Sequence, residues 1–149
     1  MSEYVILTDS SCDLTAQMAD ELGLLVLPLS VNINGREYLN YLDEREIACG
    51  DFYGMLREGH MGKTAAANPE QFIAFMEPVL KEGKDLLYLA FSSGLSGTYH
   101  AGTLAAAELE ERYPGRRVCC VDTLCASMGQ GLLVYHAAMR RKEGETLEE

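Results

Sequence analysis

Lysine and arginine are scarce in this sequence. Its 149 residues contain 12 of them against 23 aspartates and glutamates, so the formal net charge is -11 at pH 7. Binding to nucleic acid depends on clustered Lys and Arg that neutralise phosphate, and an anionic membrane surface would likewise repel this charge. Nucleic acid and charged membranes are therefore poor partners for the chain.

Long apolar stretches are absent as well. No run approaches the roughly 20 residues that a membrane-spanning helix needs. The first residues also lack the basic segment followed by an apolar segment that marks a signal peptide. We therefore expect a cytoplasmic protein without a membrane span.

The cysteines are odd in number and lack the C-x-x-C spacing of zinc and redox sites. Reduced thiols in an intracellular protein fit this pattern best, and we predict neither a metal nor a cofactor. The five are Cys12, Cys49, Cys119, Cys120 and Cys125. Because Cys119 and Cys120 lie within an apolar run, we expect them to be small buried strand residues.

Two kinds of segment alternate along the chain, as is typical of one α/β domain. Short apolar runs rich in β-formers predict strands at 4–8, 24–33, 86–91 and 117–123. Helical patterns occur at 14–22, 44–58, 69–82, 97–112 and 126–142. We predict an α/β layered fold with a mainly parallel sheet flanked by helices. Asn34-Gly35 adds a predicted β-hairpin, which would make the sheet mixed.

Two capping patterns predict helix starts. Asn68, Pro69 and Gln71 fit a capping box with proline in the first turn, so "TAAANP" is predicted to be a loop that enters a helix. Thr146 and Glu149 have the same spacing, which predicts that a further helix begins at the end of the sequence. We therefore expect a domain truncated near Thr146, with a carboxy-terminal portion absent.

A hydroxyl-rich corner, "SSGLSGT", follows the predicted strand at 86–91. Its two glycines permit a tight turn, and the N-terminus of the next helix favours an anion. Ser92 and Ser93 precede the predicted helix start, which favours a role in binding. The hydroxyls of Ser96 and Thr98 are equally well explained as helix caps.

The motifs of two enzyme classes are missing from this corner. "FSSGLSG" does not supply G-x-S-x-G, and His60, His100 and His136 are best explained as surface or packing residues. Neither G-x-x-x-x-G-K-[ST] nor G-x-G-x-x-G occurs in the sequence. A phosphate- or nucleotide-binding enzyme module that uses the Ser/Gly corner stays open as an alternative function.

Aspartates follow two other predicted strands. Asp9 and Asp13 lie in "TDSSCD", and Asp122 lies in "DTLCAS". Carboxylates at neighbouring strand ends can bind a divalent cation, but turns and helix caps explain such residues more often. Cys12 would need an activating base to act as a nucleophile, and the sequence shows none.

Five segments, in this order and spacing, resemble the amino-terminal half of the DegV family of bacterial fatty-acid-binding proteins. They read "TDSSCDLT", "PLSVNINGREY", "KTAAANPEQF", "SSGLSGTY" and "VDTLCASMGQG". The resemblance implies that residues 1–149 are the amino-terminal α/β domain of a two-domain protein that binds one long-chain fatty acid between its domains. It also implies a carrier, not an enzyme, that presents the fatty acid to a separate fatty acid kinase subunit.

Carried over by motif, the carboxylate-binding residues of the family fall on Thr64 and Ser93, with Ser92 and Gly94 as secondary candidates. Many members read T-S-Q-P-S where this chain reads "TAAAN", so hydrogen bonds from that serine and glutamine cannot form here. A strand-helix layer can bring the loops of Thr64 and Ser93 to one edge. We therefore expect both hydroxyls to converge on one carboxylate.

A fatty acid also needs a long apolar sleeve. Candidate residues for it are Met55, Leu56, Phe72, Phe75 and Met76. Their helical spacing nevertheless favours ordinary packing in the protein core.

Overall fold

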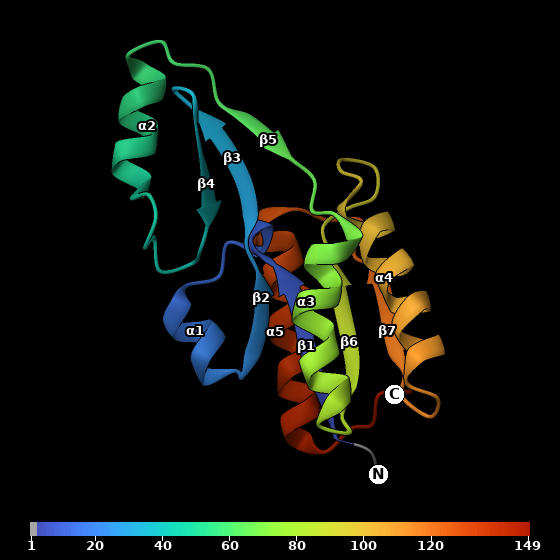
Figure 1. The fold of residues 1–149 in the computed structure, drawn as a ribbon. Coiled ribbons are helices and arrows are strands. Elements are labelled where there is room, and N and C mark those ends of the chain that lie inside the picture. The colour runs from blue at the N-terminus through green and yellow to red at the C-terminus, as the bar shows by residue number, and fades with distance from the viewer. Residues whose placement is uncertain (1–2) are drawn as a thin grey trace.

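The computed structural model describes residues 3–149, which form two β-sheets and the helices that lie beside them (Figure 1). The larger sheet is parallel and has the strand order β2-β1-β6-β7. Its strands are β1 (Tyr4–Asp9), β2 (Leu24–Leu27), β6 (Asp85–Ala90) and β7 (Val118–Asp122). The smaller sheet is antiparallel, in the order β4-β3-β5, and contains β3 (Leu29–Ile33), β4 (Arg36–Asn40) and β5 (Lys63–Ala65).

The helices lie mainly between the strands in sequence. They are the 3-10 turn η1 (Ser10–Cys12) and the α-helices α1 (Ala16–Glu21), α2 (Cys49–Arg57), α3 (Pro69–Lys81), α4 (Thr98–Arg112) and α5 (Ser127–Glu143). Helices α3 and α4 cover one face of the parallel sheet, and α5 covers the other (Figure 1). The predicted α/β layered fold with a parallel sheet and flanking helices is confirmed.

The prediction of one mixed sheet is wrong, because the hairpin belongs to a separate sheet. The apolar run at 24–33 is divided at Pro28 into β2 and β3. Proline has no N–H for a strand ladder, so pairing is interrupted there. The hairpin itself is confirmed: Asn34 and Gly35 have φ of 52° and 74°, the left-handed conformation that two-residue hairpin turns require.

The prediction that "TAAANP" is entirely a loop is also wrong. Thr64 and Ala65 belong to β5, and Thr64 pairs with Val31 of β3. All three residues of β5 are exposed, so the strand has no apolar pattern that a sequence could reveal. The capping box that follows is confirmed, since Asn68 and Gln71 exchange side-chain to backbone hydrogen bonds of 2.9 Å.

The predicted helix at Thr146 is not formed within the sequence, because residues 146–149 make a turn. Half of the predicted capping box is nevertheless present. The N–H of Thr146 donates to Oε2 of Glu149 at 2.8 Å, and Glu148 forms an ion pair with Arg117, which precedes β7.

The core lies on both faces of the parallel sheet. On one face, Tyr88 packs against Phe72 with their ring centroids 5.0 Å apart. A Cβ built at Gly102 of α4 would lie 2.5 Å from the Tyr88 ring, so the glycine lets α4 approach the sheet closely. On the other face, Val134 of α5 is fully buried with Ile6 of β1.

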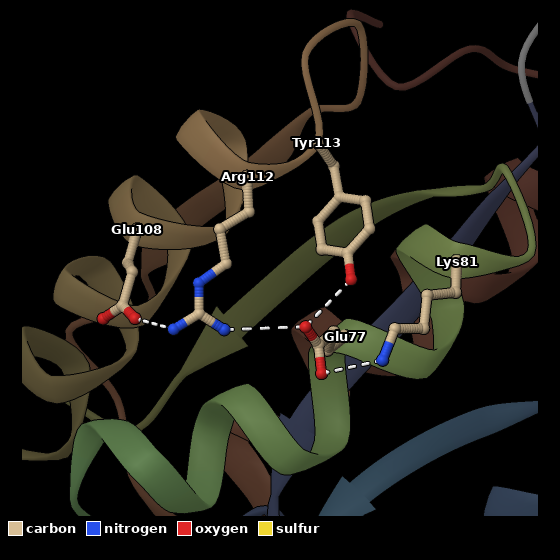
Figure 2. Close-up of polar contacts among 5 residues, drawn as sticks. All are labelled: Glu77, Lys81, Glu108, Arg112 and Tyr113. Atoms are coloured by element: carbon tan, nitrogen blue, oxygen red, sulfur yellow. Dashed lines mark hydrogen bonds and ion pairs between the residues drawn. The ribbon is translucent and has the colours of Figure 1, made fainter.

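Polar contacts also join α3 and α4, as Figure 2 shows. Glu77 accepts hydrogen bonds from Lys81 Nζ at 3.0 Å and from the Tyr113 hydroxyl at 2.8 Å. Arg112 lies 3.5 Å from the same carboxylate and pairs with Glu108 on its own helix. The hydrogen bonds from Lys81 and Tyr113 lower the pKa of Glu77.

None of the helices in residues 3–149 combines the length and the apolar character that crossing a membrane requires.

Candidate functional site

A cavity of about 460 Å³ lies where the two sheets meet. Its floor is the edge of the parallel sheet at the carboxyl ends of β1 and β6, the edge at which open α/β sheets bind ligands. The side walls come from β3, β5 and the segment that contains α2. The antiparallel sheet, which extends beyond the carboxyl ends of the parallel strands (Figure 1), thus encloses a sheet edge that would otherwise be open.

The lining of the cavity is mainly apolar with a few polar groups. The apolar residues are Leu29, Val31, Ile47, Phe52, Tyr53, Ala65, Ala66, Phe91 and Leu95. The polar residues and the one cysteine are Ser11, Asp13, Ser30, Asn40, Cys49, Thr64 and Ser96. This composition is typical of a site for a largely apolar small molecule with one polar end.

Ser10 joins the floor of the cavity to the hairpin. Its buried Oγ accepts the N–H of Leu29 at 2.9 Å and the side-chain amide of Asn40 at 3.3 Å. Both donors belong to the hairpin, while Ser10 directly follows β1. The hairpin is therefore fixed to the sheet edge through the Ser10 hydroxyl, a role that the sequence alone does not reveal.

Asp9 is a structural residue of this edge. Its carboxylate is fully buried and accepts hydrogen bonds from Ser11, Gln130, the Tyr88 hydroxyl at 3.1 Å and the N–H of Phe91 at 3.0 Å. Burial, and then the charge of Asp9, raises the pKa of Tyr88. All of the donors come from the protein, which accounts for the carboxylate without a cation.

A metal site at the strand ends finds no support in residues 3–149, where no three His, Cys, Asp or Glu side chains gather closely enough. Cys12 is buried, and burial raises the pKa of its thiol to about 11. A thiol in that state is a poor nucleophile. Asp13 accepts the Ser127 hydroxyl at 2.5 Å and lines the cavity.

The structure brings Thr64 to the cavity, on its β5 wall. Ser93 lies outside the lining, and its N–H donates to Oδ1 of Asp122 at 3.2 Å. The Ser93 side chain is the main cause of the lowered pKa of Asp122. The two predicted residues therefore occupy neighbouring segments, but only one of them faces the hollow.

The secondary candidates have structural roles in the same corner. Ser92 is buried, donates its N–H to the carbonyl of Cys125 at 2.9 Å, and accepts the N–H of Gly94 on its Oγ at 3.2 Å. These bonds fix the turn that precedes α4. Ser92 and Gly94 therefore shape the corner in which Ser93 lies.

The Thr64 segment and the serine corner are joined by a direct hydrogen bond. The N–H of Ala67 donates to Oγ1 of Thr98, the first residue of α4, at 3.4 Å. Gly97 occupies the N-cap position, and the hydroxyl of Ser96 accepts the N–H of Thr98 at 3.1 Å. Ser96 also lines the cavity, so it belongs both to the start of α4 and to the lining.

The sleeve candidates do not line the cavity. Phe72 and Met76 are fully buried in the core between α3 and the sheet, and Phe75 packs against the same core. The preference for core packing is confirmed for these three. Phe52 and Tyr53 of α2 line the cavity instead of the neighbouring Met55 and Leu56.

Residues 3–149 match the family described as uncharacterised proteins of the DegV family. The chain belongs to the DegV family. A DegV domain-containing protein of Clostridium perfringens is 44% identical to it over 149 residues, which are 100% of this chain and 51% of that protein. One from Caldanaerobacter subterraneus subsp. tengcongensis is 32% identical, over 100% of this chain and 51% of that protein.

Solved structures of DegV proteins have the same fold. A DegV family protein from Thermus thermophilus, described by its fatty acid binding, superimposes with a TM-score of 0.86 at 36% identity, over 99% of this chain and 50% of that one. A Thermotoga maritima protein described as revealing a fatty acid binding function gives a TM-score of 0.85 at 31% identity, over 99% of this chain and 52% of that one. The present chain thus spans about half the length of the DegV proteins that it matches.

Proposed function

We propose that this DegV chain supplies one half of a site for a long-chain fatty acid, which it binds without transforming it. The observation that carries the proposal is the mainly apolar cavity at the sheet edge with the Thr64 hydroxyl on its wall. Its volume of about 460 Å³ falls within the roughly 300–1,000 Å³ of small-molecule sites. Fatty acid binding by a DegV family protein of Thermus thermophilus and by a protein of Thermotoga maritima supports the same ligand class.

In this proposal the carboxylate is held by Thr64 and Ser93, and the acyl chain lies along the apolar walls. A hydroxyl that donates to a carboxylate makes a charge-assisted hydrogen bond, which is stronger than one between neutral groups. Ser93 lies just outside the cavity lining, where its N–H donates to Asp122, so its hydroxyl would have to turn toward the cavity when the ligand binds. The N-terminus of α4 beside it favours the added negative charge.

The open side of the cavity supports a site that two halves share. Tyr53 and Leu95 line the cavity and are still 54% and 67% exposed, so the apolar hollow is open on one side. We propose that residues 1–149 are the amino-terminal domain of a two-domain protein and that the second domain closes this opening. Relatives about twice as long as this chain are consistent with that arrangement.

We further propose that the complete protein is cytoplasmic and presents its fatty acid to a separate kinase subunit. Neither of the two phosphate-binding motifs occurs in these 149 residues, which supports a separate protein as the source of the chemistry at the carboxylate. Reconstitution tests this role directly: the loaded protein should yield acyl phosphate only when a fatty acid kinase and ATP are both added. Acyl phosphate formed by the protein with ATP alone would show that it is an enzyme.

The binding proposal is tested with protein expressed from its full coding sequence and titrated with oleate. We expect saturable binding of one oleate per chain, and much weaker binding of the matched alcohol, which lacks the carboxylate. Equal affinity for the acid and the alcohol would contradict a polar seat for the carboxylate. Tight binding of nucleotide with Mg²⁺ in place of oleate would favour the enzyme alternative.

A further inference from the structure

The hydroxyl of Ser96 lies at the end of a short chain of hydrogen bonds. The chain begins at the N–H of Ala67, which donates to Oγ1 of Thr98 at 3.4 Å. Thr98 Oγ1 in turn lies 2.8 Å from Oγ of Ser96, and one of the two hydroxyls donates to the other. Thr98 is fully buried, whereas Ser96 lines the cavity.

The direction of the bond between the two hydroxyls follows from counting protons. Each hydroxyl has one proton to donate. In the part of the chain that the structure describes, Ser96 Oγ is the only acceptor within hydrogen-bond distance of the Thr98 hydroxyl. If Ser96 donated to Thr98, the Thr98 proton would be buried without an acceptor, which is unfavourable. Thr98 is therefore the donor.

This direction leaves the proton of Ser96 free. Ser96 Oγ already accepts the N–H of Thr98 at 3.1 Å, and it accepts the Thr98 hydroxyl as well. Its two lone pairs are then occupied, so its remaining capacity is as a donor. Because Ser96 lines the cavity, that donor is available to an acceptor inside it.

We propose that Ser96 is a further carboxylate-binding residue of this site and that Thr98 is the positioning residue that directs its proton into the cavity. The inference rests on the proposed fatty acid function and adds a donor to Thr64 and Ser93. Hydrogen bonds in series polarise one another, so a Ser96 hydroxyl that accepts two bonds donates more strongly. The same series of hydrogen bonds connects the Ser96 hydroxyl, through Thr98 and Ala67, to the segment that follows Thr64.

Ser93 and Ser96 differ in where they lie relative to the cavity. Ser93 lies outside the lining, with its N–H on the Asp122 carboxylate, so its segment has to move before its hydroxyl can reach a ligand. Ser96 breaks no bond, because its proton has no partner in residues 3–149. Ser96 should therefore make the larger net contribution to affinity.

The experiment is a titration of the protein with oleate labelled with ¹³C at the carboxyl carbon, followed by NMR. Ser96→Ala should weaken binding by roughly ten- to hundredfold and shift the bound ¹³C carboxyl resonance. Ser96→Thr keeps the hydroxyl and should restore most of both. Ser93→Ala serves as the comparison and should weaken binding less than Ser96→Ala does.

Three outcomes decide the matter. Unchanged affinity and an unchanged carboxyl resonance in Ser96→Ala, with normal binding by the wild type, would overturn this inference and leave the proposed function intact. No oleate binding by the wild type would overturn both. If Ser96→Ala is too unstable to titrate, Ser96→Thr and Ser96→Val can be compared, because Thr and Val have nearly the same shape and only Thr has a hydroxyl. Equal oleate affinity of those two variants would refute the role of the hydroxyl.

Discussion

Replacing Asp13 by Asn should increase the affinity of the protein for a fatty acid. Asp13 lines the cavity and carries the only carboxylate of that lining within residues 3–149, so it repels a bound carboxylate. Asn suits the site, because Asp13 has a φ of 53° and Asn tolerates that left-handed conformation. The Asn side-chain oxygen can still accept the Ser127 hydroxyl, which Asp13 accepts now. The change therefore removes a charge and little else.

The size of the effect follows from Coulomb's law. A cavity of 460 Å³ is about 10 Å across if it is treated as a sphere. Two unit charges at that distance repel by about 0.4 kcal/mol in water and about 1.7 kcal/mol at an effective dielectric constant of 20. The expected gain in affinity is then roughly twofold to fifteenfold. Salt screens charges at this distance, so the gain should shrink as the ionic strength rises.

The assay is a fluorescence-displacement titration with oleate at low and at high salt. Asp20→Asn is the matched control, since Asp20 is exposed on α1 and does not line the cavity. Asp13→Asn should bind more tightly than the wild type at low salt and about equally at high salt, while Asp20→Asn should match the wild type in both. Affinity that is unchanged or lower in Asp13→Asn at low salt would refute the reasoning.

Three further predictions concern the carboxylate-binding residues, the core and the dependence of stability on pH. Thr64→Val and Ser93→Ala should each weaken oleate binding, Thr64→Val by roughly ten- to hundredfold. Neither change should alter the circular dichroism spectrum. Normal oleate binding by both variants would show that neither hydroxyl binds the carboxylate. Gly102→Ala should lower the free energy of unfolding in urea by about 1–3 kcal/mol because its Cβ would overlap a buried ring, whereas Gly54→Ala, with open space around it, should not. The folded-state pKa of Glu77 is lowered by a lysine and a tyrosine (Figure 2), so the stability it contributes is present above its unfolded pKa of about 4.5 and lost as the pH falls through the folded value. Glu77→Gln should reduce the loss of unfolding free energy as the pH falls below about 4.5. The same loss in Glu77→Gln as in the wild type would contradict this role of Glu77.

The parallel sheet and its helices could be predicted because each element carries its own local signal. The run around 86–91 is apolar throughout, as a strand buried on both faces requires, and β6 is buried at all positions but one. The start of α3 could be predicted because Asn68, Pro69 and Gln71 each favour a helix that begins at Pro69. In these segments local chemistry and the final packing agree.

The cavity itself could not be predicted, because it arises from contacts between distant segments. Strand β5 has three exposed residues and exists only through its pairing with β3. The hairpin is held over the sheet edge by the Ser10 hydroxyl, which bonds a residue 19 positions away and another 30 positions away. Nothing in the local sequence indicates that Ser96 and Thr64 line the same cavity, where the bond between Ala67 and Thr98 joins their segments.

The most direct test of the account is native mass spectrometry of protein expressed from its full coding sequence and purified without added lipid. The account predicts one copurifying aliphatic monocarboxylic acid per chain, which is lost on delipidation and regained with oleate. It also predicts that Thr64→Val retains less of this acid than the wild type does. Protein that carries nucleotide with Mg²⁺ instead, or that neither retains nor regains a fatty acid, would contradict the central claim.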